Sequence, residues 1–257
     1  MTARFGAEGW LGLAGIATLL VVWELAVRFG LISALAFPEP LAVGRALGAL
    51  AVDPSFLAQA GDTLLAWSIA MVLAVIVTVP IGLAMGYVAT LYRPASTVVH
   101  AARSIPATSL IPVAILLFGL GTPMKVAVVC YAIAWPLILN AMYGVHAVEG
   151  QLLLTGRSFG WGRRKLLWRV ILPSAVPSIA TGVRIAGSIA LLLCVSAEIL
   201  GARRGIGTTL TIYEEAHRLD FVYAGIVVVG ILGMIIFSAL SALERAATPW
   251  AHAHRAA

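Results

Sequence analysis

The sequence has 257 residues, of which 61% are hydrophobic and only 11% are charged, and its mean hydropathy is +1.01. A soluble domain is about half apolar and about a quarter charged, so this composition excludes a soluble globular protein and predicts an all-α, polytopic membrane protein. The formal net charge of +6 is typical of a membrane protein with basic cytoplasmic loops and gives no indication of a nucleic-acid partner.

Long apolar runs predict about six transmembrane helices, because a helix needs about 20 residues to cross a bilayer. The third run is interrupted by Ser104, Pro106 and Pro112. Proline frees backbone groups that need partners inside a membrane, so we expect this run to face other helices or a pathway. The predicted spans are Gly9–Val27, Thr63–Ala89, Val98–Leu120, Met124–Tyr143, Ala175–Leu200 and Phe221–Leu243.

The loops between these spans predict the orientation of the chain. If the N-terminus is cytoplasmic, ten of the 17 lysines and arginines lie on the cytoplasmic side. Cytoplasmic loops carry an excess of these residues, so both termini are predicted to be cytoplasmic. On the outer side, 37–62 is expected to contain a short surface helix, Leu41–Leu50, and Gly201–Asp220 is expected to be a polar loop.

The densest basic cluster lies in the predicted cytoplasmic segment Gly160–Pro173, GWGRRKLLWRVILP. Four cations lie there among tryptophan, leucine and valine residues. Such basic amphipathic stretches bind anionic lipid, whereas glycines at 156, 160 and 162 favour short rigid pieces suited to docking a protein. The residues alone leave both interpretations open.

No pattern in the sequence predicts catalysis. There is no G-x-x-x-x-G-K-[ST] phosphate loop, no Ser/His/Asp grouping and no H-E-x-x-H. Cys130 and Cys194 lie in apolar runs without metal-ligand spacing. We therefore predict no catalytic residue and no metal site.

Glu24, Arg184 and Glu198 are expected to lie within the membrane and are functional candidates, because a charge in hydrocarbon is costly. Glu24 is expected to pair with Arg28 at i+4, and Glu198 to anchor the turn 201–207. Arg184 lies eleven residues after Pro173, which is about 16 Å of helix. Near mid-membrane it has two alternatives: pairing with backbone carbonyls between helices, or forming a cationic ring with a second copy in the pathway.

Several motifs in the chain have a known counterpart. The spacing from Gly160 to Pro173, G-x9-V-x-L-P, resembles the cytoplasmic "EAA" loop of binding-protein-dependent ABC importer permeases of type I, whose pattern ends G-x9-I-x-L-P. The resemblance extends along nearly the whole chain, to the subgroup that handles nitrate, taurine, aliphatic sulfonates and some pyrimidine-type vitamin precursors. The other matching motifs are Phe37-Pro38-x-Pro40, Pro80-x-Gly82-x-x-x-Gly86, Ser104-Ile105-Pro106, Ile111-Pro112, Phe118-Gly119-x-Gly121, Trp135-Pro136-x-x-x-Asn140, Ala197-Glu198-x-Leu200-Gly201, Gly205-x-Gly207 and Ala224-Gly225.

One position departs from the family pattern. Where the family has Glu-Ala-Ala, this chain has Leu154-Thr155-Gly156, and Glu149 lies five residues earlier. A salt bridge from this position to the ATPase is therefore not carried over, and compensation by Glu149 stays an open question.

The resemblance implies a single transmembrane permease domain over residues 1–257, with a cytoplasmic coupling loop at about 146–173 and the Arg157–Arg169 region as the coupling helix. The coupling residues would be Arg157, Ser158, Phe159, Gly160, Trp161, Gly162, Arg163, Arg164, Leu172 and Pro173. The translocation pathway or gate would involve Ser104, Pro106, Asn140, Arg184 and Glu198.

The resemblance also implies partners. The expected assembly is a homodimer of permease subunits with two ABC ATPase subunits, in lipid of the bacterial inner membrane. ATP and Mg would be bound by the ATPase, so this chain would be non-catalytic and without a cofactor. A periplasmic or lipoprotein solute-binding protein would deliver a small anion such as a sulfonate, taurine or nitrate. The alternatives are a self-contained secondary transporter, which would need ion-coupling acids at mid-membrane, and an intramembrane enzyme.

Overall fold

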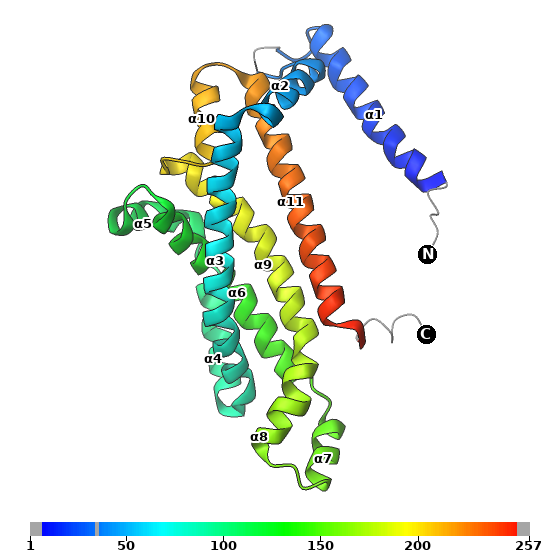
Figure 1. Ribbon diagram of the computed structural model, residues 1–257, viewed down its shortest axis with the longest axis vertical. Coiled ribbons are helices and arrows are strands. Elements are labelled where there is room, and N and C mark those ends of the chain that lie inside the picture. Colours follow the sequence, from blue (N-terminus) through cyan, green and yellow to red (C-terminus); the bar gives the residue numbers. More distant parts are fainter. Residues whose placement is uncertain (1–6, 34–35, 251–257) are drawn as a thin grey trace. The chain divides into compact units, whose positions relative to one another are not determined.

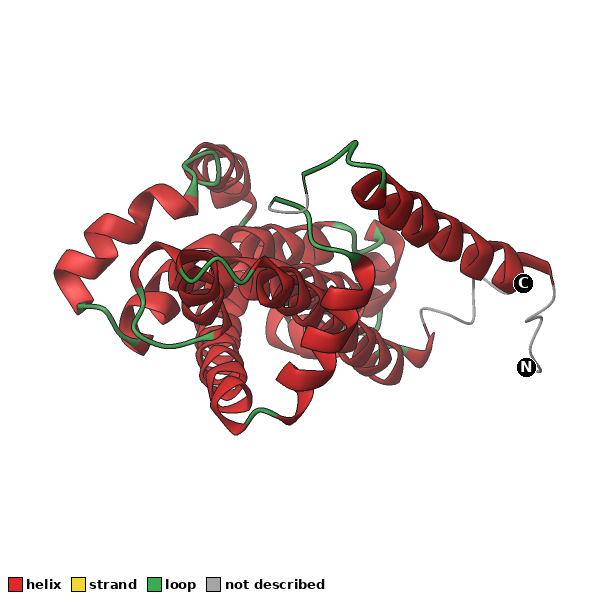
Figure 2. Ribbon diagram, turned by 90° about the horizontal axis from the view of Figure 1, so that it is seen from above, coloured by secondary structure: helices red, strands yellow, loops and turns green. Residues whose placement is uncertain are grey.

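The computed structural model describes residues 7–33 and 36–250, and within these ranges the chain forms helices and no strand (Figures 1 and 2). The helices follow one another with short connections. They are α1 (Ala7–Arg28), α2 (Pro40–Val52), α3 (Pro54–Tyr87), α4 (Ala89–Ala102), the 3-10 helix η1 (Ala107–Leu110), α5 (Ile111–Phe118), α6 (Thr122–His146), α7 (Gly150–Ser158), α8 (Arg163–Leu166), the π-helical η2 (Leu167–Ile171), α9 (Leu172–Gly201), α10 (Ile206–Glu215) and α11 (Leu219–Ala247).

Five helical stretches in the described part of the chain are long and apolar enough to cross a membrane, and a bent helix pair makes a sixth. The five are 10–28, 54–87, 122–146, 163–201 and 219–247. This confirms the prediction of an all-α, multi-pass membrane protein with about six spans. The basic residues at the two ends of the chain, Arg4 and Arg255, lie outside the described residues.

The third predicted span, Val98–Leu120, is wrong as a single helix. The chain instead bends by 73° between Thr90–Ala102 and Ala107–Phe118. Proline disfavours a helical conformation at the residue before it and has no N–H to donate. Pro106 accordingly stands in an extended conformation at the N-cap of η1, four residues after the end of α4, and separates the two helical pieces.

Two other boundaries differ from the predictions. Helix α3 begins at Pro54 rather than Thr63, because proline is accepted in the first turn of a helix and Asp53 accepts hydrogen bonds from the N–H and hydroxyl of Ser55 at 2.9 Å. These hydrogen bonds lower the pKa of Asp53. The predicted polar loop Gly201–Asp220 contains helix α10. The predicted surface helix Leu41–Leu50 is confirmed as α2.

The chain divides into two compact units. The first comprises residues 1–58 and 209–230. Within it, Trp23 of α1, Phe37 and Tyr223 of α11 form an aromatic cluster with ring centroids 5.0 to 6.2 Å apart. Glu24 pairs with Arg28 at 2.6 Å, as the sequence predicts.

The second unit comprises residues 59–208 and 231–257. Its core is formed by small and branched apolar side chains of α3, α6 and α9, including Ala66, Ala70, Ile133, Ala186 and Ala190, none of them exposed. Small residues let helices approach closely in a membrane, where packing rather than water exclusion drives association. The repeated alanines therefore explain the close packing of these three helices.

Two glycines allow an even closer approach where α3 contacts α6. A Cβ at Gly82 would lie 2.7 Å from the carbonyl oxygen of Ile138, and one at Gly86 would lie 2.9 Å from that of Met142. Both neighbours are backbone atoms, which have no rotamer with which to move away. The motif Pro80-x-Gly82-x-x-x-Gly86 thus marks a helix contact that excludes any larger side chain.

Candidate functional site

Helices α7 and α8 form a turn at one end of the second unit (Figure 1). Gly160 has φ +73°, and its N–H donates to the carbonyl of Arg157 at 2.8 Å. The N–H of Trp161 donates to the carbonyl of Gly156 at 3.0 Å. L-residues rarely adopt this left-handed conformation, so Gly160 allows the chain to reverse between the two helices.

This geometry corrects two details of the predicted coupling region. The segment Arg157–Arg169 is not one helix, because α7 ends at Ser158 and α8 begins at Arg163. The following span begins before the predicted Ala175, since the helix runs from Arg163 through a π-helical turn at 167–171 into α9. Pro173 cannot donate to the carbonyl four residues earlier, and the wider turn before it accommodates that loss.

Most of the predicted coupling residues lie on the surface. Phe159 is 73% exposed, and the Lys165 ammonium lies 4.8 Å from the ring centroid of the half-buried Trp161. Leu172 is half-buried in the first turn of α9. The exposed residues of the set are Arg157, Ser158, Phe159, Gly160, Gly162, Arg163, Arg164 and Pro173.

Glu149, which lies five residues before the position where this chain lacks the family's glutamate, stands at the N-cap of α7. Its carbonyl accepts the N–H of Leu152 at 3.0 Å, while its side chain makes no capping hydrogen bond. Leu154, at the position of the family's acid, is 63% exposed. Its apolar side chain is therefore exposed on α7 and cannot form the ion pair that an acid at this position could form.

A groove of about 510 Å³ opens beside the bend that follows α4. Pro106 and Asn140, two of the predicted pathway residues, line it together with Arg103, Tyr131 and Trp135. Ser104 lies between two lining residues in the chain, and its hydroxyl donates to the carbonyl of His100 at 3.1 Å. We call this the α4–α6–α9 groove, since Ile185, Ile189 and Leu192 of α9 form its remaining wall.

The polar groups of the groove are only partly satisfied. The Tyr131 hydroxyl donates to the carbonyl of Ala102 at 3.1 Å, and the Asn140 amide donates to the carbonyl of Pro136 at 2.8 Å. The Trp135 ring packs edge-on against Tyr131, and its buried indole Nε1 has no hydrogen-bond partner within the described residues. Among the described residues that line the groove there is no carboxylate, and Arg103 is the one arginine or lysine.

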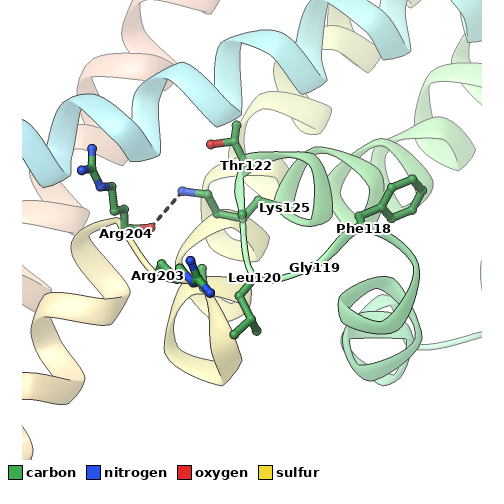
Figure 3. Close-up of a pocket in the computed structure, with 9 residues that line it drawn as sticks. Phe118, Gly119, Leu120, Thr122, Lys125, Arg203 and Arg204 are labelled. Atoms are coloured by element: carbon green, nitrogen blue, oxygen red, sulfur yellow. Dashed lines mark hydrogen bonds between the residues drawn. The ribbon is translucent and has the colours of Figure 1, made fainter.

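Glu198 lies in a different place, in a buried ion pair with Lys125. The Lys125 Nζ lies 2.9 Å from Glu198 Oε1, and the two side chains are 2% and 0% exposed. The same Nζ donates to the carbonyl of Arg204 at 3.0 Å (Figure 3). Lys125 thereby joins the start of α6 to the chain that follows α9.

The Glu198 carboxylate accepts further hydrogen bonds from the Thr63 hydroxyl at 2.9 Å and from the N–H of Gly207 at 3.0 Å. A Cβ at Gly205 would collide with this carboxylate. Every oxygen of the buried acid is therefore occupied, which is the arrangement that makes a buried charge tolerable. The predicted anchoring of the turn 201–207 by Glu198 is present.

Arg184 also pairs with an acid, Glu244 of α11, with an Nε to Oε2 distance of 3.2 Å. The Thr181 hydroxyl donates to the same carboxylate at 2.8 Å, and the Arg184 guanidinium lies 5.4 Å from the ring centroid of Phe237. Arg184 does not line the α4–α6–α9 groove. Its role in a pathway stays a prediction, and so does that of Glu198.

Sequence reasoning missed Lys125 and Glu244. Lys125 was not named among the candidates within the membrane, although it lies at the start of the apolar run of α6. A signal was present, because a charge within a span is expected to pair with another, and Glu198 and Arg184 each needed an opposite partner. Which partner each one has depends on helix packing.

Comparison with known protein families shows to which family the chain belongs. Residues 78–248 match the family described as binding-protein-dependent transport system inner membrane component. The chain belongs to this family. It is thus a transport permease subunit and a multi-pass membrane protein, and the alternative of a self-contained secondary transporter is not supported.

Named relatives of this permease extend over almost its whole length. The taurine transport system permease protein TauC of Escherichia coli is 32% identical over 245 residues, which cover 93% of this chain and 89% of TauC. The putative aliphatic sulfonates transport permease protein SsuC of Bacillus subtilis is 24% identical, over 96% of this chain and 90% of SsuC. These relatives confirm the predicted subgroup.

Solved structures confirm the fold of the permease. A chain of a bacterial alginate ABC transporter, in complex with an alginate-bound periplasmic protein, superposes with a TM-score of 0.65 at 15% identity, covering 94% of this chain and 96% of that one. A chain of the inward-facing methionine transporter MetNI superposes with a TM-score of 0.64 at 20% identity, covering 73% of this chain and 93% of that one.

Proposed function

We propose that this permease carries a small organic anion of the sulfonate class, such as taurine, through a pathway that includes the α4–α6–α9 groove. Two copies of the chain form the pathway, two separate ATPase subunits bind at the turn between α7 and α8, and a solute-binding protein delivers the anion on the opposite side. Both termini are cytoplasmic, and the chain itself performs no chemistry.

The composition of the groove carries this proposal. Arg103 supplies a guanidinium whose planar donors suit the oxygens of a sulfonate. No acid lines the groove to neutralise it. Within the described part of the chain, the Trp135 Nε1 is a buried donor without an acceptor, and such a group costs about 1–3 kcal/mol. A passing oxyanion that accepts from this N–H after a small ring movement recovers that cost.

The turn between α7 and α8 supports the position of the ATPase. Its exposed Phe159 and cationic neighbours present a rigid surface, because Gly160 and two backbone hydrogen bonds fix the reversal. A rigid element transmits a rigid-body movement between subunits. The position of this turn at the start of the long helix 163–201 connects it directly to the wall of the groove.

The test is ATP-driven uptake of radiolabelled taurine by the permease reconstituted with its ATPase and its solute-binding protein. Trp135→Phe keeps the ring and removes the N–H, and Arg103→Gln removes the charge. Arg93→Gln is the matched control, since Arg93 lies on α4, the helix that Arg103 caps, but does not line the groove.

We expect both groove variants to reduce uptake with assembly unchanged, while the control transports normally. Normal uptake by Trp135→Phe and Arg103→Gln would remove the groove from the pathway. Taurine uptake that requires an ion gradient and no ATPase would overturn the proposed function as a whole.

A further inference from the structure

A second cavity, of about 640 Å³, lies on the side of α8 that faces the ends of α3 and α6. We call it the basic cavity. Arg157, Arg163 and His146 contribute its polar wall, and Val145, Leu166 and Ile171 are apolar lining residues. The cavity is separate from the α4–α6–α9 groove, with which it shares no lining residue.

The charge of the basic cavity is one-sided. The described residues that line it include no aspartate or glutamate. Within the part of the chain that the structure describes, neither Arg157 nor Arg163 lies within salt-bridge distance of a carboxylate. Two guanidinium groups around one hollow repel each other unless an anion lies between them. The wall therefore selects for a negatively charged group.

The position of the cavity indicates where that group comes from. The lining residues Tyr87 and His146 are the last residues of α3 and α6, two of the membrane-spanning helices, and Ile171 directly precedes α9. The cavity thus lies where spans end. Trp168 of the same segment is 64% exposed, and exposed tryptophan is typical of the membrane–water interface.

The two kinds of wall match an amphiphile. The guanidinium groups suit a phosphate, which arginine binds with paired hydrogen bonds. The hydroxyl groups of Tyr87 and Thr90, which also line the cavity, are additional donors. The apolar residues suit the glycerol and first methylenes of a lipid. Basic pockets between membrane helices on the cytoplasmic side are known to bind lipid headgroups.

We propose that the basic cavity binds the phosphate headgroup of an anionic phospholipid from the cytoplasmic leaflet. The bound lipid bridges α7, α8 and the ends of α3 and α6, and so stabilises the turn between α7 and α8. This site does not depend on the substrate of the permease or on its ATPase.

The experiment is a native mass-spectrometry titration of the full-length permease with phosphatidylglycerol. The cavity variant is the double substitution Arg157→Gln and Arg163→Gln. The matched control is Arg164→Gln and Arg169→Gln, which removes the same charge from the same segment but from residues that do not line the cavity. Equal size-exclusion profiles establish that both variants are folded.

We expect the apparent Kd of phosphatidylglycerol to rise roughly 30-fold in the cavity variant and to change little in the control. Phosphatidylcholine, whose headgroup has no net charge, should bind weakly to both. Equal affinity of the two variants for phosphatidylglycerol would overturn the proposal.

Two competition experiments distinguish a bound lipid from a free anion and from an acidic surface of the ATPase. Inorganic phosphate should fail to displace the lipid, and efficient displacement would assign the cavity to a free anion instead. The ATPase subunits should bind with the lipid retained. Loss of one lipid for each ATPase bound would assign the arginines to the subunit interface and refute the lipid site.

Discussion

Replacing Lys125 by methionine should destabilise the permease strongly, because the substitution leaves a buried carboxylate without its cation. Methionine nearly preserves the length of the apolar stem. Glu198 would keep the hydrogen bonds from Thr63 and Gly207 but lose the ammonium group 2.9 Å away. Breaking one side of a buried pair costs about 3–5 kcal/mol.

The assay is thermal unfolding of the detergent-solubilised permease. A loss of this size should lower the unfolding midpoint on the order of 10 °C for a chain of this length. Hydrogen exchange should rise in the turn 201–207, because Lys125 donates to the carbonyl of Arg204 and Glu198 accepts from Gly207. The double variant Lys125→Met, Glu198→Gln should recover part of the loss, since it buries no lone charge.

Arg204→Gln is the matched control. Arg204 pairs with Asp62 at 3.9 Å with a side chain that is 74% exposed, and such surface pairs contribute about 0–1 kcal/mol. The substitution keeps the carbonyl that Lys125 uses. A midpoint for Lys125→Met no lower than that of the control would refute the assignment of this pair as the link between α6 and the turn after α9.

Three further predictions concern the turn, the helix contacts and the second ion pair. Gly160→Ala should cost about 1–2 kcal/mol because its φ is +73° and should weaken ATPase co-purification, whereas Gly162→Ala, with negative φ and open space, should not. Gly86→Ala should lower the thermal midpoint because the added Cβ would press on the α6 backbone. Gly61→Ala on the same helix has no atom within 4 Å of the added Cβ, so it should raise the free energy of unfolding by about 0.5–1 kcal/mol and the midpoint with it. The opposite order of the two midpoints would contradict the close contact of α3 with α6. Arg184→Glu should reduce both stability and uptake. The charge exchange Arg184→Glu with Glu244→Arg should restore stability, measured by the same thermal unfolding. A double variant no more stable than the single one would show that the 3.2 Å pair is not energetically coupled.

The sequence by itself determined the class of protein, the approximate spans and the family. These follow from local properties: apolar runs of a minimum length, and short motifs such as G-x9-V-x-L-P that are recognised from residue spacing along the chain. It also determined contacts within one helical turn or one loop. The pair Glu24–Arg28 and the anchoring of the turn by Glu198 belong to this kind.

Only the tertiary structure decided how distant residues combine. Lys125 and Glu198 are 73 positions apart, and Thr181 and Glu244 are 63 apart, so their pairing depends on which helix faces meet. The bend after α4 and the groove beside it likewise require α6 and α9 to be in place. A periodic pattern shows that a residue lies on a helix, but packing determines which distant side chain it meets. Here packing gave two of the three membrane candidates, Arg184 and Glu198, a partner of opposite charge on another helix.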